Sequence, residues 1–222
     1  MRRLRDNALT LTFLVLLLGA LVGQSLVGLA DYNDAARTAH LAEIDWATYV
    51  TSSAFGVDVA ENWQSEYLQF TLYIFLTVWL VQRGSAESKP PGQEGLGTDE
   101  QQRVGPFAQA DSPRAARAGG IGTRVFGFSL TLVMAVIFLL SWATQAVAGR
   151  VALNEERIRD QLDPLTLGQY LGDTDFWGRT LQNWQSEFLA VASMAIFTVY
   201  LRQRGSPESK QVGAPHAETP GP

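Results

Sequence analysis

The chain has 222 residues and a formal net charge of −5, and its apolar residues are gathered into four runs separated by polar stretches. It contains no Cys, which excludes disulfides and thiolate metal sites. Its two His stand far apart without partner ligands, which argues against a zinc site. No basic face accumulates anywhere, which argues against nucleic-acid binding. We therefore expect no cofactor, no metal and no nucleic-acid partner.

The first apolar run follows a basic N-terminus and carries no charge from Ala8 to Ala30. Because about 20 residues cross a bilayer core as a helix, the run predicts a first membrane span. A cleaved signal peptide is the alternative, since Gly28, Leu29 and Ala30 offer the small residues that signal peptidase reads. The length of the run favours the span. No helix breaker follows until Gly56, so we expect this helix to continue to about Ile44.

An aromatic-rich stretch, residues 46–55, precedes the second apolar run and is ended by Gly56. Trp and Tyr prefer the membrane interface, so we expect this stretch to lie along it. The second span is Trp63 to Val81, in which Glu66 is the one charge. Trp63 and Trp79 would lie about 24 Å apart on a helix, a plausible spacing for two aromatic belts.

Repeated Pro and Gly residues follow the second span, and residues 90–123 are expected to form a flexible linker without a core. The third span runs from about Val125 to Ala148, and its helix should continue to Leu162. Asp163 and Pro164 are expected to restart a short helix, with Asp as its cap and Pro in its first turn. The fourth span is Trp184 to Leu201.

One polar heptad occurs twice, 121 positions apart: Asn-Trp-Gln-Ser-Glu-Tyr-Leu at 62–68 and Asn-Trp-Gln-Ser-Glu-Phe-Leu at 183–189. We call these two segments the cassettes. An apolar run follows each cassette and ends in the same way, with Gln-Arg-Gly-Ser-x-Glu-Ser-Lys at 82–89 and 203–210. We call these two segments the exit loops. Shared blocks of this length at one offset indicate an internal duplication.

Each copy of the duplication contains two spans, so both copies insert the same way round. We predict an all-α integral membrane protein of four transmembrane helices, a tandem parallel repeat of two helical hairpins with helical extensions on the extracytoplasmic side. The expected parts are a first two-span repeat at 1–89, the cytoplasmic linker at 90–123, a second two-span repeat at 124–210 and a disordered tail at 211–222.

Lys and Arg are distributed unevenly between the two sides of this arrangement. The segments between paired spans, 31–61 and 149–183, hold one and four of the 17 basic residues, whereas the N-terminus, linker and tail hold the other twelve. Basic residues favour the cytoplasmic side, so both termini and the linker are predicted to be cytoplasmic in the plasma (inner) membrane.

Glu66 and Glu187 are ionisable residues at the outer ends of predicted spans, a position that suggests either a structural or an ion-handling role. Gln24 and Gln145 are expected at the same depth, so a Gln–Glu hydrogen bond between helices could satisfy both groups. The candidate polar layer comprises Gln24, Asn62, Ser65, Glu66, Gln145, Asn183, Ser186 and Glu187. The expected interface anchors are Trp63, Trp79, Trp184 and Tyr200.

The duplicated cassettes and exit loops resemble an uncharacterised family of bacterial four-span membrane proteins, a domain of unknown function. The resemblance implies a fold and a multi-pass bacterial membrane protein, and it implies no activity. A non-enzymatic structural, stress-related or assembly role is the favoured function class. A small proton or cation channel or transporter that uses the paired glutamates is the alternative, and an enzyme is the least favoured class because no catalytic motif is present. The expected partners are the lipid bilayer and other membrane proteins or a second copy of the chain.

Overall fold

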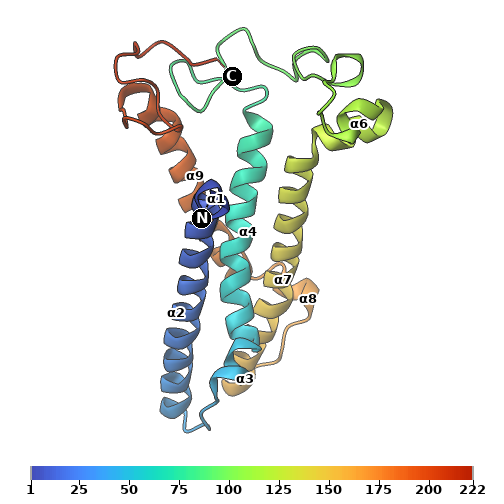
Figure 1. The fold of residues 1–222 in the computed structure, drawn as a ribbon. Helices are drawn as coiled ribbons and strands as arrows, with labels where there is room; N and C mark the ends of the chain where they lie inside the picture. The colour runs from blue at the N-terminus through green and yellow to red at the C-terminus, as the bar shows by residue number, and fades with distance from the viewer. Residues whose placement is uncertain (1, 222) are drawn as a thin grey trace. The chain divides into compact units, whose positions relative to one another are not determined.

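Helices and the turns between them make up the regular structure of the chain (Figure 1). The computed structural model describes residues 2–221, and these include no strand. The all-helical part of the fold prediction is confirmed. Four helices are long: α2 (Ala8–Thr38), α4 (Ser53–Leu76), α7 (Ser129–Arg159) and α9 (Thr174–Tyr200). The shorter elements are α1 (Arg2–Asp6), α3 (Trp46–Val50), the 3-10 helix η1 (Gly105–Phe107), α5 (Arg114–Ala118), α6 (Gly120–Gly127) and α8 (Leu167–Tyr170).

Two helices among residues 2–221, α2 and α7, are long and apolar enough to cross a membrane. Each has 31 residues, which corresponds to about 46 Å of helix. Only 6% and 17% of their most apolar stretches are buried. Apolar helices whose side chains are this exposed are compatible with insertion into a lipid bilayer.

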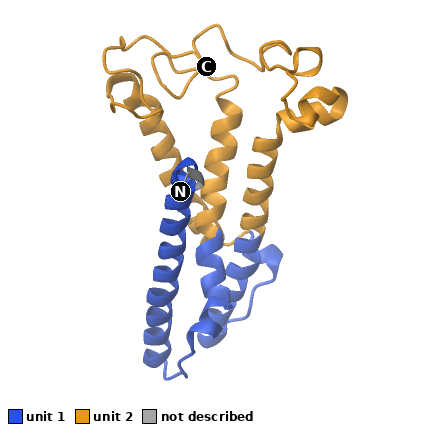
Figure 2. Cartoon of the chain, in the orientation of Figure 1, with its two compact units in different colours: residues 1–60, 144–171 blue, residues 61–143, 172–222 orange. Residues whose placement is uncertain are grey.

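The chain divides into two compact units (Figure 2). The first unit comprises residues 1–60 and 144–171, and the second comprises residues 61–143 and 172–222. Each unit therefore contains segments from both copies of the duplication, and each is described separately below.

In the first unit, α2 ends at Thr38, whereas the sequence predicts that this helix continues to about Ile44. His40 adopts φ 57°, which reverses the chain, and the Leu41 amide donates to the Ala36 carbonyl at 2.8 Å. The Asn33 amide then holds Ile44 at both of its backbone groups, with 2.9 Å to the Ile44 oxygen and 3.0 Å to its nitrogen. The prediction failed because a side chain eleven residues upstream supplies the hydrogen bonds that a longer helix would have supplied.

The second copy of this segment folds back in the same way. Gln161 adopts φ 59°, and the Leu162 amide donates to the Arg157 carbonyl at 2.7 Å. Asn154 holds Leu165 with distances of 2.9 Å to its oxygen and 2.7 Å to its nitrogen. We call residues 28–50 and 149–171 the fold-back modules. The two segments thus share individual hydrogen bonds as well as sequence.

Each fold-back module ends in a short helix that carries a buried tyrosine. Tyr49 in α3 lies with its hydroxyl against Gly28, and Tyr170 in α8 lies in the same way against Gly149. The tyrosines are 3% and 0% exposed, so each ring closes its module as a small core. A glycine is required opposite each hydroxyl because a side chain there would occupy the same space.

The caps of α3 and α8 occupy equivalent positions of the repeat. The Asp45 carboxylate accepts from the Thr48 amide at 2.8 Å, and Thr166 forms a capping box with Gln169. This result corrects the predicted restart of the helix at Asp163 and Pro164, because the capping hydroxyl stands three residues later. The Asp45 carboxylate accepts hydrogen bonds from the backbone N–H and from the side chain of Thr48, and both lower its pKa.

The sequence predicts that Gly56 ends the aromatic stretch, and this prediction is wrong. Gly56 lies within α4. The Ser52 hydroxyl accepts from the Phe55 amide at 3.3 Å, so the helix starts before the glycine. A Cβ atom at Gly56 would lie 3.6 Å from the Ala148 Cβ on α7. Gly56 therefore permits close packing of two helices. In a sequence, a glycine with this role cannot be told from one that ends a helix.

In the second unit, α4 ends at Leu76, five residues before the predicted end of the second span at Val81. The β-branched Thr77 and Val78 are weak helix formers, and the Gly95 amide donates to the Val78 carbonyl at 2.7 Å. Trp79, the predicted inner anchor, lies in the turn that follows. The end of α9 at Tyr200 lies within one residue of the prediction, and its start at Thr174 lies ten residues before the predicted span.

The two exit loops share one hydrogen-bond pattern. In each, the first Ser amide donates to the Gln carbonyl, at 3.1 Å in 82–89 and 3.2 Å in 203–210. The Gln amide donates to the second Ser hydroxyl, at 2.8 Å and 2.9 Å. The intervening glycines, Gly84 and Gly205, have φ 86° and 85°, as the third position of a type II turn requires.

The lysine that closes each exit loop ties down the chain that follows it. Lys89 donates to the Gly95 carbonyl at 2.5 Å, and Lys210 donates to the carbonyls of Pro215, His216 and Glu218 at 2.9 to 3.1 Å.

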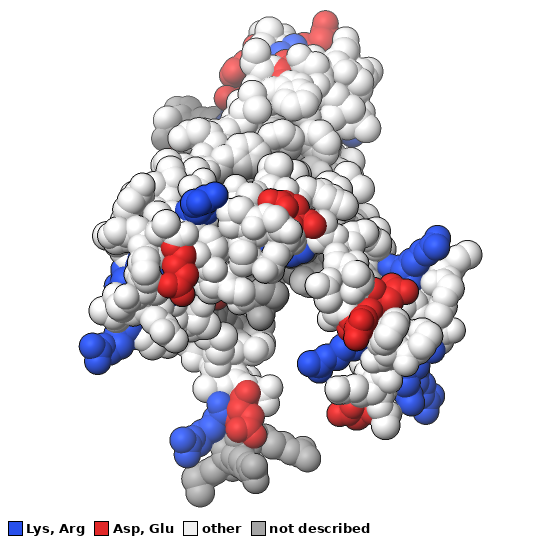
Figure 3. Space-filling model, turned by 90° about the horizontal axis from the view of Figure 1, so that it is seen from above, with Lys and Arg blue, Asp and Glu red and all other residues white. Residues whose placement is uncertain are grey.

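The linker and the tail contain little regular structure. Residues 90–123 and 211–221 contain only η1, α5 and part of α6. Viewed from the side of the linker and tail, charged side chains of both signs are scattered among uncharged ones (Figure 3).

Candidate functional site

The first cassette lies in the middle of α4 and turns the side chains of Gln64 and Ser65 inward. Gln64 is 0% exposed and Ser65 is 1% exposed, and Leu68 completes the same buried side one turn later. Asn62 and Glu66 lie on the exposed side of the helix. Because successive residues of a helix are separated by about 100°, only part of a five-residue polar motif can face one neighbour.

The second cassette, on α9, presents a different set of side chains to the first. The Trp184 Nε1 donates to the Gln64 Oε1 at 2.8 Å. The Ser65 Oγ lies 3.2 Å from the Glu187 Oε1 and donates to it, and it also lies 2.9 Å from the Asn62 carbonyl. Two hydrogen bonds between side chains therefore join the cassettes, and each pairs unlike positions of the repeat.

An ion pair extends this contact by one helical turn. Arg179 on α9 places its Nη1 3.0 Å from the Glu61 Oε2 on α4, and its Nε lies 3.2 Å from the Asp175 Oδ1. Burial disfavours the charge on Arg179, but the hydrogen bond to Glu61 and the charge of Asp175 raise its pKa above the usual value. Arg179 therefore remains a cation and bridges the two helices.

An aromatic cluster stands beside the contact between cassettes. Trp142 on α7 stacks on Phe138 and Phe176, with ring centroids 5.6 Å and 5.9 Å away. Trp184 lies 5.9 Å from the Trp142 ring, and the Trp142 Nε1 lies 3.4 Å from the Thr180 hydroxyl, which accepts from it. The tryptophan that binds Gln64 is thus fixed in place by packing on its other side.

Part of the predicted polar layer is brought together in this way. Ser65 and Glu187 meet, whereas Asn183 and Ser186 bond to their own helix, at the Arg179 and Asn183 carbonyls. Glu66 is exposed, although its charge is close enough to interact with that of Glu187. Gln24 on α2 is half-buried and Gln145 on α7 is fully buried, both in the first unit. The proposed Gln24–Glu66 and Gln145–Glu187 bonds remain predictions.

Three of the four expected interface anchors, Trp63, Trp79 and Tyr200, are exposed. Trp184 is partly buried and differs from them in its hydrogen bond to Gln64. Sequence reasoning missed Gln64 and the Glu61–Arg179 pair. The i, i+4 spacing of Asp175 and Arg179 was a signal for their own ion pair within α9, but no sequence signal pointed to Glu61 as the second partner of Arg179. Nothing in the motif distinguished Gln64 from Gln185.

Among residues 2–221, no group of three or more His, Cys, Asp and Glu side chains is arranged to hold a metal ion. The chemistry of the site is hydrogen bonding and ion pairing between two helices. These features define a class: an all-helical protein that has two helices of membrane-spanning length and a polar contact between duplicated motifs.

The chain belongs to the family described as "Domain of unknown function (DUF6766)", whose model matches residues 1–221. The match covers both cassettes, both exit loops and the linker between the copies. Neither the curated proteins nor the solved structures include a match.

Proposed function

We propose that this chain is a four-span protein of the bacterial plasma membrane, with both termini and the linker in the cytoplasm. We propose further that its role is non-enzymatic, in membrane structure, stress response or assembly, with the lipid bilayer and other membrane proteins or a second copy as partners. The observation that carries the role is the contact between cassettes. Gln64 and Ser65 are used to hold Trp184 and Glu187, so the motif repeated in the chain serves helix association.

The lengths of α4 and α9 support the additional two spans. They have 24 and 27 residues, about 36 Å and 40 Å of helix, against a hydrocarbon core of about 30 Å. The charged residues of both helices lie within or before the cassettes, and the helix beyond each cassette carries no charge. Phe70 and Phe75 on α4, and Ile196 and Phe197 on α9, are exposed large hydrophobic side chains. A bilayer would cover them.

Single cysteines provide a direct test of the topology, because the natural chain has none and needs no background substitutions. Cysteines introduced at positions 40 and 160 should react with a membrane-impermeant maleimide added to intact cells. Cysteines at position 100 and in the tail should react only after permeabilisation. External labelling at position 100 would reverse the proposed orientation, and a mature N-terminus at Asp31 would show that α2 is a cleaved signal.

A small proton or cation channel is the second candidate, and the proximity of the Glu66 and Glu187 charges is the observation that favours it. Flux of protons and cations into liposomes containing the wild-type chain, compared with Glu66→Gln plus Glu187→Gln, separates the two functions. The structural role predicts no flux above that of empty liposomes for either protein. A flux that the double substitution abolishes, without lowering thermal stability, would replace the structural role with the channel.

A further inference from the structure

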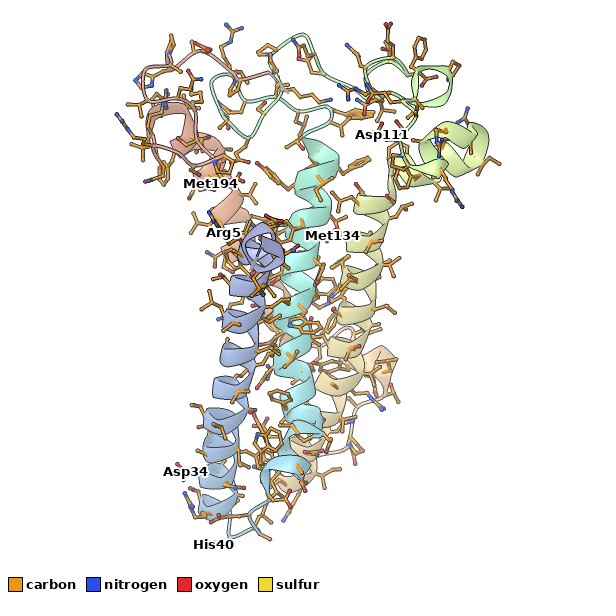
Figure 4. All side chains as sticks on the ribbon, viewed as in Figure 1. Arg5, Asp34, His40, Asp111, Met134 and Met194 are labelled. Carbon is orange, nitrogen blue, oxygen red and sulfur yellow. The ribbon has the colours of Figure 1, made fainter. Side chains whose placement is uncertain are left out.

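The inner ends of the two repeats differ at one informative position. Tyr73 on α4 donates its hydroxyl proton to the Glu87 Oε2 in the first exit loop, at 2.5 Å. Its counterpart on α9, 121 positions later, is Met194, which is labelled in Figure 4 and has no hydroxyl to offer. The counterpart of Glu87 is retained as Glu208. Both exit loops therefore carry a glutamate, but only the helix of the first repeat carries a tyrosine at this position.

A cavity of about 420 Å³ opens beside this tyrosine, within the second unit. Its walls come from α4, from α9 and from the first exit loop. The α9 wall includes Ala192 and Ala195, where the equivalent positions of α4 carry Thr71 and Ile74. These smaller side chains leave the space open. The apolar lining is completed by Leu72, Leu76, Leu80 and Val191.

Glu87 is the one acidic residue in the lining of this cavity. Its Oε2 accepts from Tyr73, whereas its Oε1 is buried and no backbone, amide or hydroxyl donor among the described residues reaches it. Burial raises the pKa of Glu87, the hydrogen bond from Tyr73 lowers it, and the adjacent Glu208 carboxyl raises it through a shared hydrogen bond and through its charge. Two adjacent carboxyl groups cannot both carry a charge without cost, so they must share a proton or bind a cation that donates to them.

We propose that this cavity is a binding site for a hydrophobic primary amine, with its apolar chain between α4 and α9 and its ammonium group at Glu87 and Glu208. The volume lies within the range of small-molecule sites, and the lining is apolar except at its exit-loop end and at Gln69 and Thr77. An ammonium group has three N–H donors and a positive charge. It can therefore donate to the Glu87 Oε1 and, in place of a shared proton, balance two carboxyl groups at once, which a neutral alcohol or a quaternary ammonium group cannot do.

This inference goes beyond the proposed membrane role and does not depend on the number of spans or on their orientation, because all of its residues belong to one compact unit. Its failure and the failure of the proposed function are therefore distinguishable. The topology is measured by cysteine labelling in cells, whereas the site is measured by binding to the purified full-length chain.

The test is equilibrium binding of radiolabelled decylamine to the full chain in maltoside micelles, with protein-free micelles as the baseline for partitioning. We expect saturable binding of one amine per chain. Competition by unlabelled decanol and decyltrimethylammonium should be at least tenfold weaker than competition by decylamine, since a charge-assisted hydrogen bond is worth about tenfold or more in affinity.

Two variants locate the site, and a third is the control. Glu87→Gln should weaken binding at least tenfold, and Ala195→Leu should weaken it by filling the cavity without touching a charge. Glu100→Gln, an exposed carboxyl of the linker, should bind as the wild type does. Thermal unfolding without amine identifies any variant that fails to fold, and Ala195→Leu and the competitor series test the site independently of Glu87.

Binding that does not saturate, or that is equal in the wild type and Ala195→Leu, would overturn the proposed site. Decanol or decyltrimethylammonium competing as strongly as decylamine would overturn the requirement for a primary amine, and unchanged binding in Glu87→Gln would overturn the role of the carboxyl group.

Discussion

The two fold-back modules and the two cassettes both consist of repeated sequence, and their structures match to different degrees. Asn33 and Asn154 make the same pair of backbone hydrogen bonds in their modules. Gln64 and Gln185 stand at equivalent positions of the cassettes, but Gln64 is fully buried and Gln185 is exposed. The modules use contacts within one segment, whereas the cassettes contact each other. Repeated sequence therefore gives the same contacts within a segment, whereas a contact between two such segments is asymmetric.

The largest effect is expected at the module asparagines. Asn33→Ala and Asn154→Ala should each lower the free energy of unfolding by about 2 to 3 kcal/mol, because each leaves a backbone N–H and a backbone C=O without their partner. The measurement is unfolding in mixed detergent micelles, with the exposed Glu156→Ala as control. Losses that differ by more than 1 kcal/mol between the two asparagines would break the equivalence of the modules.

The module glycines should give a slightly smaller effect. Gly28→Ala and Gly149→Ala place a Cβ atom against the hydroxyls of Tyr49 and Tyr170, which are buried and cannot move aside. We expect a net loss of about 2 kcal/mol in each, since overpacking costs about 1–3 kcal/mol and is partly offset by the better helix propensity of alanine. Gly23→Ala is the matched control, because nothing lies within 4 Å of its Cβ position. It should be neutral or stabilising.

The cassette glutamines sharpen the comparison directly. Gln64→Leu should cost about 1 kcal/mol, because it removes the acceptor of the Trp184 indole N–H in a desolvated contact. Gln185→Leu is the same substitution at the equivalent, exposed position and should change the free energy of unfolding by less than about 0.5 kcal/mol. Equal effects in thermal unfolding would show that the cassettes are used symmetrically.

The smallest effect is expected for the predicted Gln24–Glu66 hydrogen bond. Hydrogen bonds between helices in membranes are worth about 0.6 kcal/mol on average, so Gln24→Leu and Glu66→Leu should be non-additive by about that amount. Glu66→Gln should be milder than Glu66→Leu, because an amide still forms a hydrogen bond. Strict additivity in the double-mutant cycle would eliminate the pairing and leave Glu66 with its interaction with Glu187.

Sequence alone located the long helices, the duplication and the equivalent positions of its two copies, because hydrophobic runs and repeated motifs are properties of the chain itself. α2 begins at Ala8 as its run predicts, whereas α7 begins at Ser129 and ends at Arg159, inside the predicted 125–162, and α9 starts ten residues before its predicted span. The shared exit-loop pattern follows from a shared sequence. The tertiary structure decided what depends on a partner. Gly56 lies within a helix because it faces Ala148, and α2 stops at Thr38 because the chain folds back onto Asn33. Packing between two helices decided which side chain of each cassette faces inward, Gln64 in one and Trp184 in the other. Two motifs that differ only at Tyr67 and Phe188 do not by themselves encode this difference.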